Sequence, residues 1–245
     1  MSSPLLLAAA GDVGGDFFRE RDVGDLCQAQ PDHLFCWDWA QENIDRFGTP
    51  TVQHLQIVVP AILIGFLVAF ALALLSHRTR WLQPPLLAAT GVLYTIPSIA
   101  FFFLLLPLTG LGRDTAIIVL AAYTLQIIYR NTILGLNNVP ASVKDAARGM
   151  GFTNRQILWK VELPLAIPEI VAGLRVAVVS TIAIATLAVL ISAGGLGTEM
   201  YGSNLNFPTA IVIAGAIVVL MALTFDAILL LVQRLATPWR RVKQA

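Results

Sequence analysis

The sequence predicts an all-α membrane protein with about five transmembrane helices, and two observations lead to this fold class. Only 13% of the 245 residues are charged, whereas a soluble domain carries roughly 25%. Four stretches also lack Asp, Glu, Lys, Arg and His altogether, at 55–75, 82–112, 176–198 and 200–225. Each is long enough to cross a bilayer core, which needs about 20 apolar residues. A soluble amphipathic helix would show polar residues on the face that meets water.

Five membrane spans fit this pattern, at about 52–75, 84–107, 115–136, 167–192 and 207–235. The second apolar stretch is longer than one span requires, and Pro97 lies inside it. Proline removes a backbone hydrogen bond from a helix. We therefore expect a kink or break at Pro97, buried against protein because lipid cannot satisfy the freed backbone groups.

The basic residues predict the orientation of the chain. They follow the first span, fill the loop between the third and fourth spans, and follow the last span: Arg78, Arg80, Arg130, Lys144, Arg148, Arg155, Lys160, Arg234, Arg240, Arg241 and Lys243. With five spans, all three regions fall on one side, and short loops rich in Lys and Arg face the cytoplasm. The N-terminus is thus expected outside and the C-terminus inside a cell (inner or cytoplasmic) membrane that the chain crosses several times.

The resulting organisation is an extracytoplasmic acidic tail over 1–50, a transmembrane domain over 51–236 with a cytoplasmic loop at 137–164, and a cytoplasmic tail over 237–245. The acidic tail contains the two cysteines of the chain, Cys27 and Cys36. An oxidising space outside the cell would allow them to form a disulfide. The alternative is two unpaired thiols near the membrane.

The loop at 137–164 is too polar for the membrane and too regular for a linker. A short helix is predicted over 141–150, with Pro140 suited to its start. Gly151 can adopt the positive φ that ends a helix, and Thr153 can cap a second short helix over 154–162. Leu163-Pro164 is expected to turn the chain into the fourth span. The loop should therefore be a rigid object that projects from the membrane.

This loop resembles the EAA loop of ATP-binding-cassette (ABC) importer permeases of type I. That family shows Glu-Ala-Ala, three residues, Gly, nine residues and Ile-x-Leu-Pro. The present chain has Asp145-Ala146-Ala147, then Gly151, then Val161-Glu162-Leu163-Pro164, at matching spacing. Asp145 stands for Glu and Val161 for Ile, and both keep the chemistry, although the shorter Asp145 can change one contact with a partner.

The resemblance implies that the loop couples the chain to a separate ATPase, through Asp145, Ala146, Ala147, Gly151, Glu162, Leu163 and Pro164. The implied partners are two ATP-binding subunits, a second permease subunit (identical or related), an extracytoplasmic substrate-binding protein and membrane lipid. ATP and Mg would be bound by the partner ATPase, with no cofactor in this chain. The small Ala146 and Ala147 would allow close approach. A pair of amphipathic helices lying on lipid is the alternative reading of the same loop.

Three further strings look like those of osmoprotectant permeases, which carry quaternary ammonium solutes such as glycine betaine, choline and carnitine: Tyr94-Thr95-Ile96-Pro97-Ser98, Arg130-Asn131-Thr132 and Ser192-Ala193-Gly194-Gly195-Leu196-Gly197. The resemblance covers about residues 51–235. Methionine permeases look similar at the last string, so a permease for another small solute such as methionine is the main alternative. A stand-alone carrier is a further one.

Polar residues inside the predicted spans give two more hypotheses. Arg175 and Asp226 lie at similar depth, and charges within spans are usually paired, so their charged groups are expected within about 8 Å of each other, a distance that one water can bridge. Six residues are candidates to line the pathway: Tyr94, Pro97, Ser98, Tyr123, Gln126 and Asn131. Hydrogen bonding between helices is the alternative role for the polar members of this set.

Enzymatic chemistry is not indicated. The histidines at 33, 54 and 77 are scattered, and no His-Glu-x-x-His metal pair or Walker motif occurs in the sequence. No metal site is expected. The net charge of +1 gives no sign of nucleic-acid binding. The sequence thus predicts a non-catalytic membrane subunit.

Overall fold

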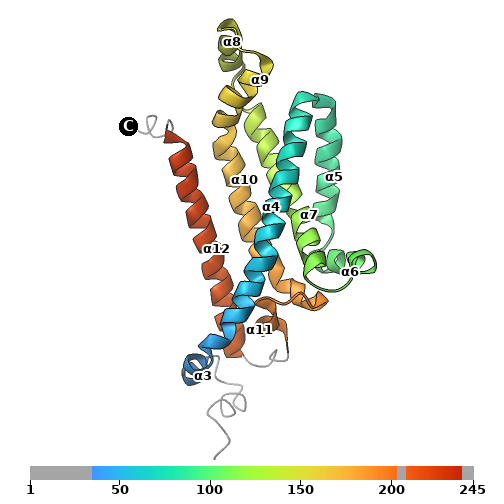
Figure 1. Ribbon diagram of the computed structural model, residues 1–245, viewed down its shortest axis with the longest axis vertical. Helices are drawn as coiled ribbons and strands as arrows, with labels where there is room; N and C mark the ends of the chain where they lie inside the picture. The colour runs from blue at the N-terminus through green and yellow to red at the C-terminus, as the bar shows by residue number, and fades with distance from the viewer. Residues whose placement is uncertain (1–34, 203–207, 239–245) are drawn as a thin grey trace, which may run out of the picture.

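The computed structural model describes residues 35–202 and 208–238, and the regular elements within these ranges are all helical (Figure 1). They are α3 (Trp37–Glu42), η1 (Ile44–Phe47), α4 (Gly48–Arg78), η2 (Arg80–Leu82), α5 (Gln83–Thr95), α6 (Ser98–Thr109), α7 (Arg113–Asn137), α8 (Ala141–Gly149), α9 (Asn154–Ile157), the π-helical η3 (Leu158–Glu162), α10 (Leu163–Ala185), η4 (Thr186–Ile191), α11 (Gly197–Tyr201) and α12 (Pro208–Ala236).

The predicted fold class is confirmed by four helical stretches long and apolar enough to cross a membrane. These are Ile44–Arg78, Arg113–Asn137, Asn154–Ile191 and Pro208–Ala236. A fifth crossing is supplied if the bent pair Arg80–Thr95 and Ser98–Thr109 counts as one span. Helix α4 runs on to Arg78, three residues past the end expected for the first span.

The second span is broken into α5 and α6, which meet at an angle of 99°. The break falls at Pro97, as predicted, and α5 ends at Thr95 while α6 begins at Ser98. The expectation that the break is buried against protein was wrong for the isolated chain, because Pro97 is exposed. The freed carbonyl of Ile96 is nevertheless satisfied, since it accepts a hydrogen bond from the Tyr123 hydroxyl.

Helix α7 is the centre of the bundle and packs against α4, α5, α6 and α10. Two glycines let its neighbours approach closely. A Cβ added at Gly65 of α4 would lie 1.6 Å from Thr124 Oγ1 of α7, and one added at Gly173 of α10 would lie 2.4 Å from Asn131 Cβ. Small residues at helix contacts are the usual means of close packing in membranes. Helix α7 therefore fixes the relative positions of α4 and α10.

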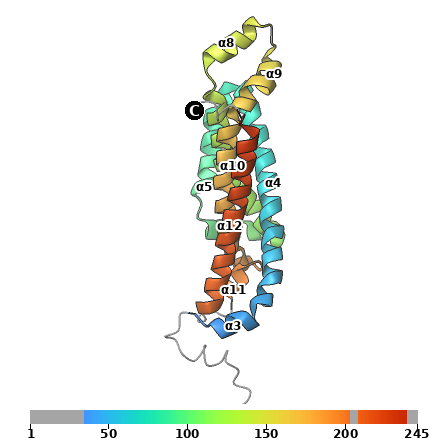
Figure 2. The same cartoon turned by 90° about the vertical axis from the view of Figure 1, so that its left-hand side faces the viewer.

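One end of the bundle is closed by α3, η1 and α11, opposite the end that carries α8 and α9 (Figures 1 and 2). The Cys36 amide donates to Thr209 Oγ1 at 2.9 Å, and Arg46 Nε lies 3.0 Å from Glu199 Oε2. Residues 35–47 are thus packed on the bundle, whereas residues 1–34 of the acidic tail, including Cys27, lie outside the described residues. The same applies to 239–245 of the C-terminal tail.

The Gly194-Gly195 string forms a tight turn at this closed end. Gly194 and Gly195 have φ of 81° and 87°, values that favour glycine. The Gly195 amide donates to Gln53 Oε1 of α4 at 3.1 Å. This string therefore has a structural role, which is to seat the end of the α10–η4 segment against the start of α4.

Candidate functional site

The projecting loop begins with α8, which stands at the far end of the molecule from α3 (Figures 1 and 2). Gly151 has φ of 82°, the positive value predicted for it. Its amide donates to the Arg148 carbonyl at 2.9 Å, and the Phe152 amide donates to the Ala147 carbonyl at 3.1 Å. These two bonds form a Schellman motif, in which a left-handed residue ends the helix and turns the chain. Gly151 therefore fixes the angle between α8 and α9.

The second half of the loop differs from the prediction. Thr153 caps α9 as expected, in a capping box with Gln156. However, Leu163-Pro164 does not turn the chain, because the helical stretch Asn154–Ile191 runs through it without interruption. In a regular α-helix the ring of Pro164 would clash with the carbonyl of Lys160. The chain instead widens into a π-helix from Leu158 to Glu162. The loop therefore consists of the separate helix α8 followed by an N-terminal extension of α10.

The seven predicted coupling residues separate into two groups by exposure. Asp145, Ala146 and Gly151 are exposed, and Asp145 forms an exposed ion pair with Arg148 Nη1 at 2.8 Å. By contrast, Ala147 is only 2% exposed. Close approach to a partner therefore remains a prediction for the exposed Ala146, while Ala147 packs inside the loop. Glu162 and Leu163 are also buried, and Pro164 is half-buried.

The buried Glu162 joins three elements at the base of the loop. Its Oε1 lies 2.8 Å from Lys144 Nζ of α8, and its Oε2 lies 2.9 Å from His77 Nε2 at the end of α4. The side chains of Glu162, Lys144 and His77 are 9%, 15% and 11% exposed. Because water is largely excluded, the charges of Glu162 and Lys144 depend on each other, and His77 makes a hydrogen bond to the same carboxylate. We call Glu162, Lys144 and His77 the loop anchor, since they hold α8 to the ends of α4 and α10.

The loop anchor was not predicted as a unit. The sequence marks Glu162 through its place in the loop motif and Lys144 through its charge, and it gives no sign that His77 lies near either. His77 is 85 residues from Glu162 in sequence, so no local pattern connects them. A second buried histidine was missed for the same reason: His54 Nε2 lies 3.0 Å from the Ile182 carbonyl, between α4 and α10.

The structure brings Arg175 and Asp226 together between α10 and α12. Arg175 Nε donates to Asp226 Oδ1 and Arg175 Nη2 donates to Asp226 Oδ2, both at 2.7 Å. This bidentate geometry matches the planar guanidinium to the carboxylate. The rest of the protein covers little of α12, since only 6% of the most apolar segment of this helix is buried. The ion pair is therefore a main polar contact between α12 and the rest of the bundle.

Replacing Asp226 with asparagine is expected to lower the thermal unfolding midpoint of the protein in detergent by several degrees, because Arg175 keeps its charge within the span and loses its partner. A double replacement, Arg175→Met with Asp226→Met, should recover part of the loss. Thr224→Val on the same helix is the control, since Thr224 is exposed and bonds only to the Leu220 carbonyl. Equal midpoints for Asp226→Asn and the control would contradict this assignment.

The predicted pathway residues do not share one environment. Tyr123 is buried and donates to the Ile96 carbonyl, Gln126 accepts from Thr90 Oγ1, and Asn131 Nδ2 donates to the Ile127 carbonyl at 2.8 Å. The bonds of Tyr123 and Gln126 connect α7 to neighbouring segments, as the alternative role requires, whereas the bond of Asn131 lies within α7. Tyr94 and Pro97 are exposed and Ser98 is half-buried beside the broken span. A pathway role for the six remains a prediction.

Cys36 is disulfide-bonded. Since Cys27 lies outside the described residues, its pairing with Cys36 remains a prediction. In the ranges 35–202 and 208–238, no group of three or more His, Cys, Asp or Glu side chains is placed to hold a metal ion.

A bundle of helices long and apolar enough to span a membrane, with one helical loop projecting beyond it, defines the class of multi-pass membrane proteins. Residues 61–242 match the family described as binding-protein-dependent transport system inner membrane component, and the chain belongs to this family. It is similar to a solved structure of the inward-facing MetNI methionine ABC transporter, with a TM-score of 0.66 and 21% identity over 76% of this chain and 93% of that one. This likeness shows the type I permease fold.

Curated relatives are more similar in sequence. The chain is 36% identical to the osmoprotectant import permease protein OsmW of Salmonella typhimurium, over 80% of this chain and 94% of that protein. It is 39% identical to the carnitine transport permease protein OpuCB of Listeria monocytogenes, over 76% and 86%. It is 37% identical to the glycine betaine/carnitine/choline permease protein OpuCD of Bacillus subtilis, over 78% and 84%.

Proposed function

We propose that this chain is the permease subunit of an ABC importer for osmoprotectants, that is, for small quaternary ammonium solutes. The observation that carries the proposal is the exposed face of α8, which projects beyond the bundle and is set at a fixed angle by Gly151. The names of the curated relatives support the solute class. The chain itself would perform no chemistry and would provide the route across the membrane.

In this proposal α8 docks into a partner ATPase, which binds ATP and Mg, and a second permease subunit completes the pathway. The docking face comprises Asp145, Ala146 and the exposed apolar Val143 and Met150. Small and apolar exposed side chains suit a helix that enters a groove of another protein. Closure of two ATPase subunits would draw two such helices together and switch the permease pair between its two open states.

The proposal places α8, the α4–α5 connection and the end of α12 on the cytoplasmic side. The three regions lie at one end of the molecule (Figure 1), which agrees with the distribution of Lys and Arg along the chain. The end closed by α3 and α11 would then face an extracytoplasmic binding protein. Such a protein would select the solute, for which an aromatic cage around the quaternary ammonium group is the expected chemistry.

The test is copurification from native membranes in mild detergent, comparing wild type with Gly151→Val, followed by mass spectrometry. An ATPase and a binding protein are expected with the wild type, and the ATPase is expected to be lost from the variant. Calorimetry then measures which solutes the binding protein binds. Glycine betaine, choline or carnitine is expected to bind, and methionine is not. Transport by the purified chain alone without ATP would instead favour a stand-alone carrier.

A further inference from the structure

A groove runs between the end of α4 and the α9–η3 segment, on the flank of the loop. It consists of two adjoining cavities of about 500 and 550 Å³. Arg78, Arg155 and Leu158 line both. The first cavity adds Leu74, Leu75 and Trp159, and the second adds polar and charged groups that include Arg80 and Arg148. We call the whole the basic groove. It is apolar toward the middle of the bundle and cationic toward the loop.

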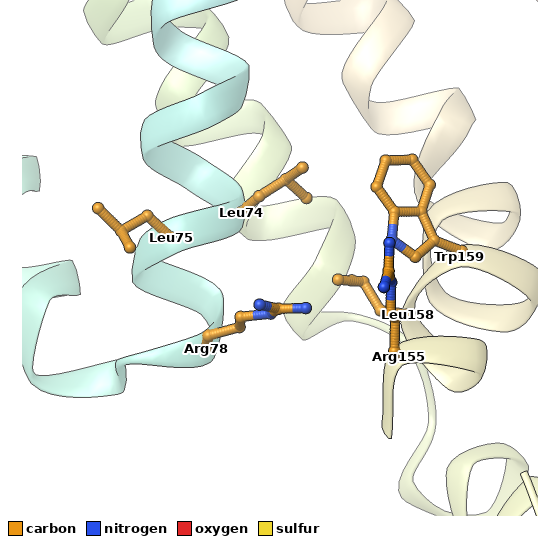
Figure 3. Close-up of a pocket in the computed structure, with 6 residues that line it drawn as sticks. All are labelled: Leu74, Leu75, Arg78, Arg155, Leu158 and Trp159. Carbon is orange, nitrogen blue, oxygen red and sulfur yellow. The ribbon is translucent and has the colours of Figure 1, made fainter. Parts of the chain in front are cut away.

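Three of the four arginines of the basic groove have no carboxylate partner among the described residues. The side chains of Arg78, Arg80 and Arg155 form no ion pair or hydrogen bond with these residues, whereas Arg148 is paired with Asp145. The one carboxylate of the groove, Glu162, already has both oxygens occupied by Lys144 and His77. Figure 3 shows Arg78 reaching from the end of α4 into the gap, toward the segment that carries Arg155. Like charges that face each other across a gap favour an anion between them.

The groove lies where α4, one of the helices long and apolar enough to span a membrane, ends. Arg78 is the last residue of α4, a position where the helix dipole also favours a cation. Leu75, one turn earlier, is 52% exposed, and Trp81 and Trp159 are 73% and 52% exposed. Exposed tryptophans next to the ends of spans are typical of the headgroup level of a bilayer. A ligand of this groove therefore meets a charged half outside the hydrocarbon and an apolar half inside it.

We propose that the basic groove binds an anionic phospholipid on the side of the membrane that carries the loop. Its phosphate would lie between Arg78 and Arg155, and an acyl chain would follow Leu74, Leu75 and Trp159. Cationic pockets between helices at the headgroup level suit such lipids. A soluble anion would leave the apolar half unused, and an ATPase docked on α8 would meet Asp145 and Ala146, which do not line the groove. The bound lipid would connect α4 to α9 beside the ion pairs of Glu162, which lines the second cavity.

The test is native mass spectrometry of the full-length protein, purified and equilibrated with mixed micelles that contain phosphatidylglycerol or phosphatidylcholine. Wild type is expected to retain phosphatidylglycerol in preference to phosphatidylcholine. The double variant Arg78→Gln with Arg155→Gln is expected to bind phosphatidylglycerol more weakly by about fivefold for each arginine. The charge-preserving double variant Arg78→Lys with Arg155→Lys should keep most of the affinity, and it also shows whether these positions tolerate substitution.

Arg113→Gln is the matched control. Arg113 is exposed at the start of α7, whereas it is the other end of α7 that leads into the loop beside the groove. This variant is expected to bind phosphatidylglycerol like wild type. Unchanged binding in the Gln double variant would overturn the proposal, as would equal retention of both lipids by wild type. Displacement of the lipid by soluble glycerol phosphate would assign the groove to free phosphate and overturn it too. Loss of a copurified ATPase with lipid binding intact would assign the groove to protein docking, against the proposal.

Discussion

Replacing Gly151 with valine is expected to abolish ATP-driven uptake while leaving the helices within the membrane intact. The φ of 82° is the cause, since a left-handed conformation costs an ordinary residue about 1–2 kcal/mol and is more unfavourable still for a β-branched one. Space is not the cause, because a Cβ at this position would meet no heavy atom within 4 Å. The Schellman motif should open, and α8 should lose its fixed angle to α9.

The measurement is uptake into vesicles that contain the assembled transporter, with thermal unfolding of the purified chain alongside. Gly151→Asn is the matched control, because asparagine tolerates positive φ. Uptake should fall in the order Gly, Asn, Ala, Val, with unfolding midpoints that change little. If the asparagine and valine variants were equally inactive, side-chain size rather than backbone conformation would be responsible, and the assignment of Gly151 as the element that sets the angle would be wrong.

Replacing Glu162 with glutamine is expected to destabilise the folded loop by roughly 3 kcal/mol, the lower part of the range for breaking a buried ion pair. The change removes the negative charge that Lys144 and His77 share at 2.8 and 2.9 Å. Uptake should fall with stability, because α8 would no longer be held to the ends of α4 and α10. Thermal unfolding and vesicle uptake measure the two effects.

Asp145→Asn offers the matched control, since it breaks an ion pair on the same loop whose side chains are 66% and 59% exposed. Its effect on stability should be less than about 1 kcal/mol. Adding Lys144→Met to Glu162→Gln should restore part of the lost stability, because one unpaired cation is then removed. A Glu162→Gln variant as stable as Asp145→Asn would show that the loop anchor does not hold the loop.

Much of this architecture could be predicted because a lipid bilayer restricts which residues a membrane-spanning segment can contain. An uncharged stretch of about 20 residues seldom occurs except in a membrane span, and charges such as Arg175 and Asp226 need a partner wherever they lie in a span. Gly151 could be predicted because the turn after α8 depends on local backbone preference. These features rest on the bilayer or on neighbours in sequence, so the sequence displays them directly.

Features that depend on distant contacts could not be predicted. The loop anchor forms because the end of α4 lies beside η3 in the fold, and no residue near His77 in the sequence indicates this. Pro164 was expected to turn the chain because proline commonly ends a helix, but a π-helical turn accommodates it. At Pro97 a break was predicted, yet its 99° angle depends on where α6 packs. The basic groove was not predicted, because Arg78 and Arg155 are distant in the sequence and line one cavity only in the fold.

The unbroken passage from the cap of α9 through Pro164 to the end of α10 has a mechanical consequence. At about 1.5 Å per residue, residues 154–185 make a rod roughly 45–50 Å long. Its N-terminal end is held beside α8 by the loop anchor, and its C-terminal end leads into the glycine turn held by Gln53. A pivot of about 5° at one tip displaces the other by about 4 Å. In the proposed importer the segment would act as a lever arm that transmits a small movement from a docked ATPase to the opposite end of the bundle.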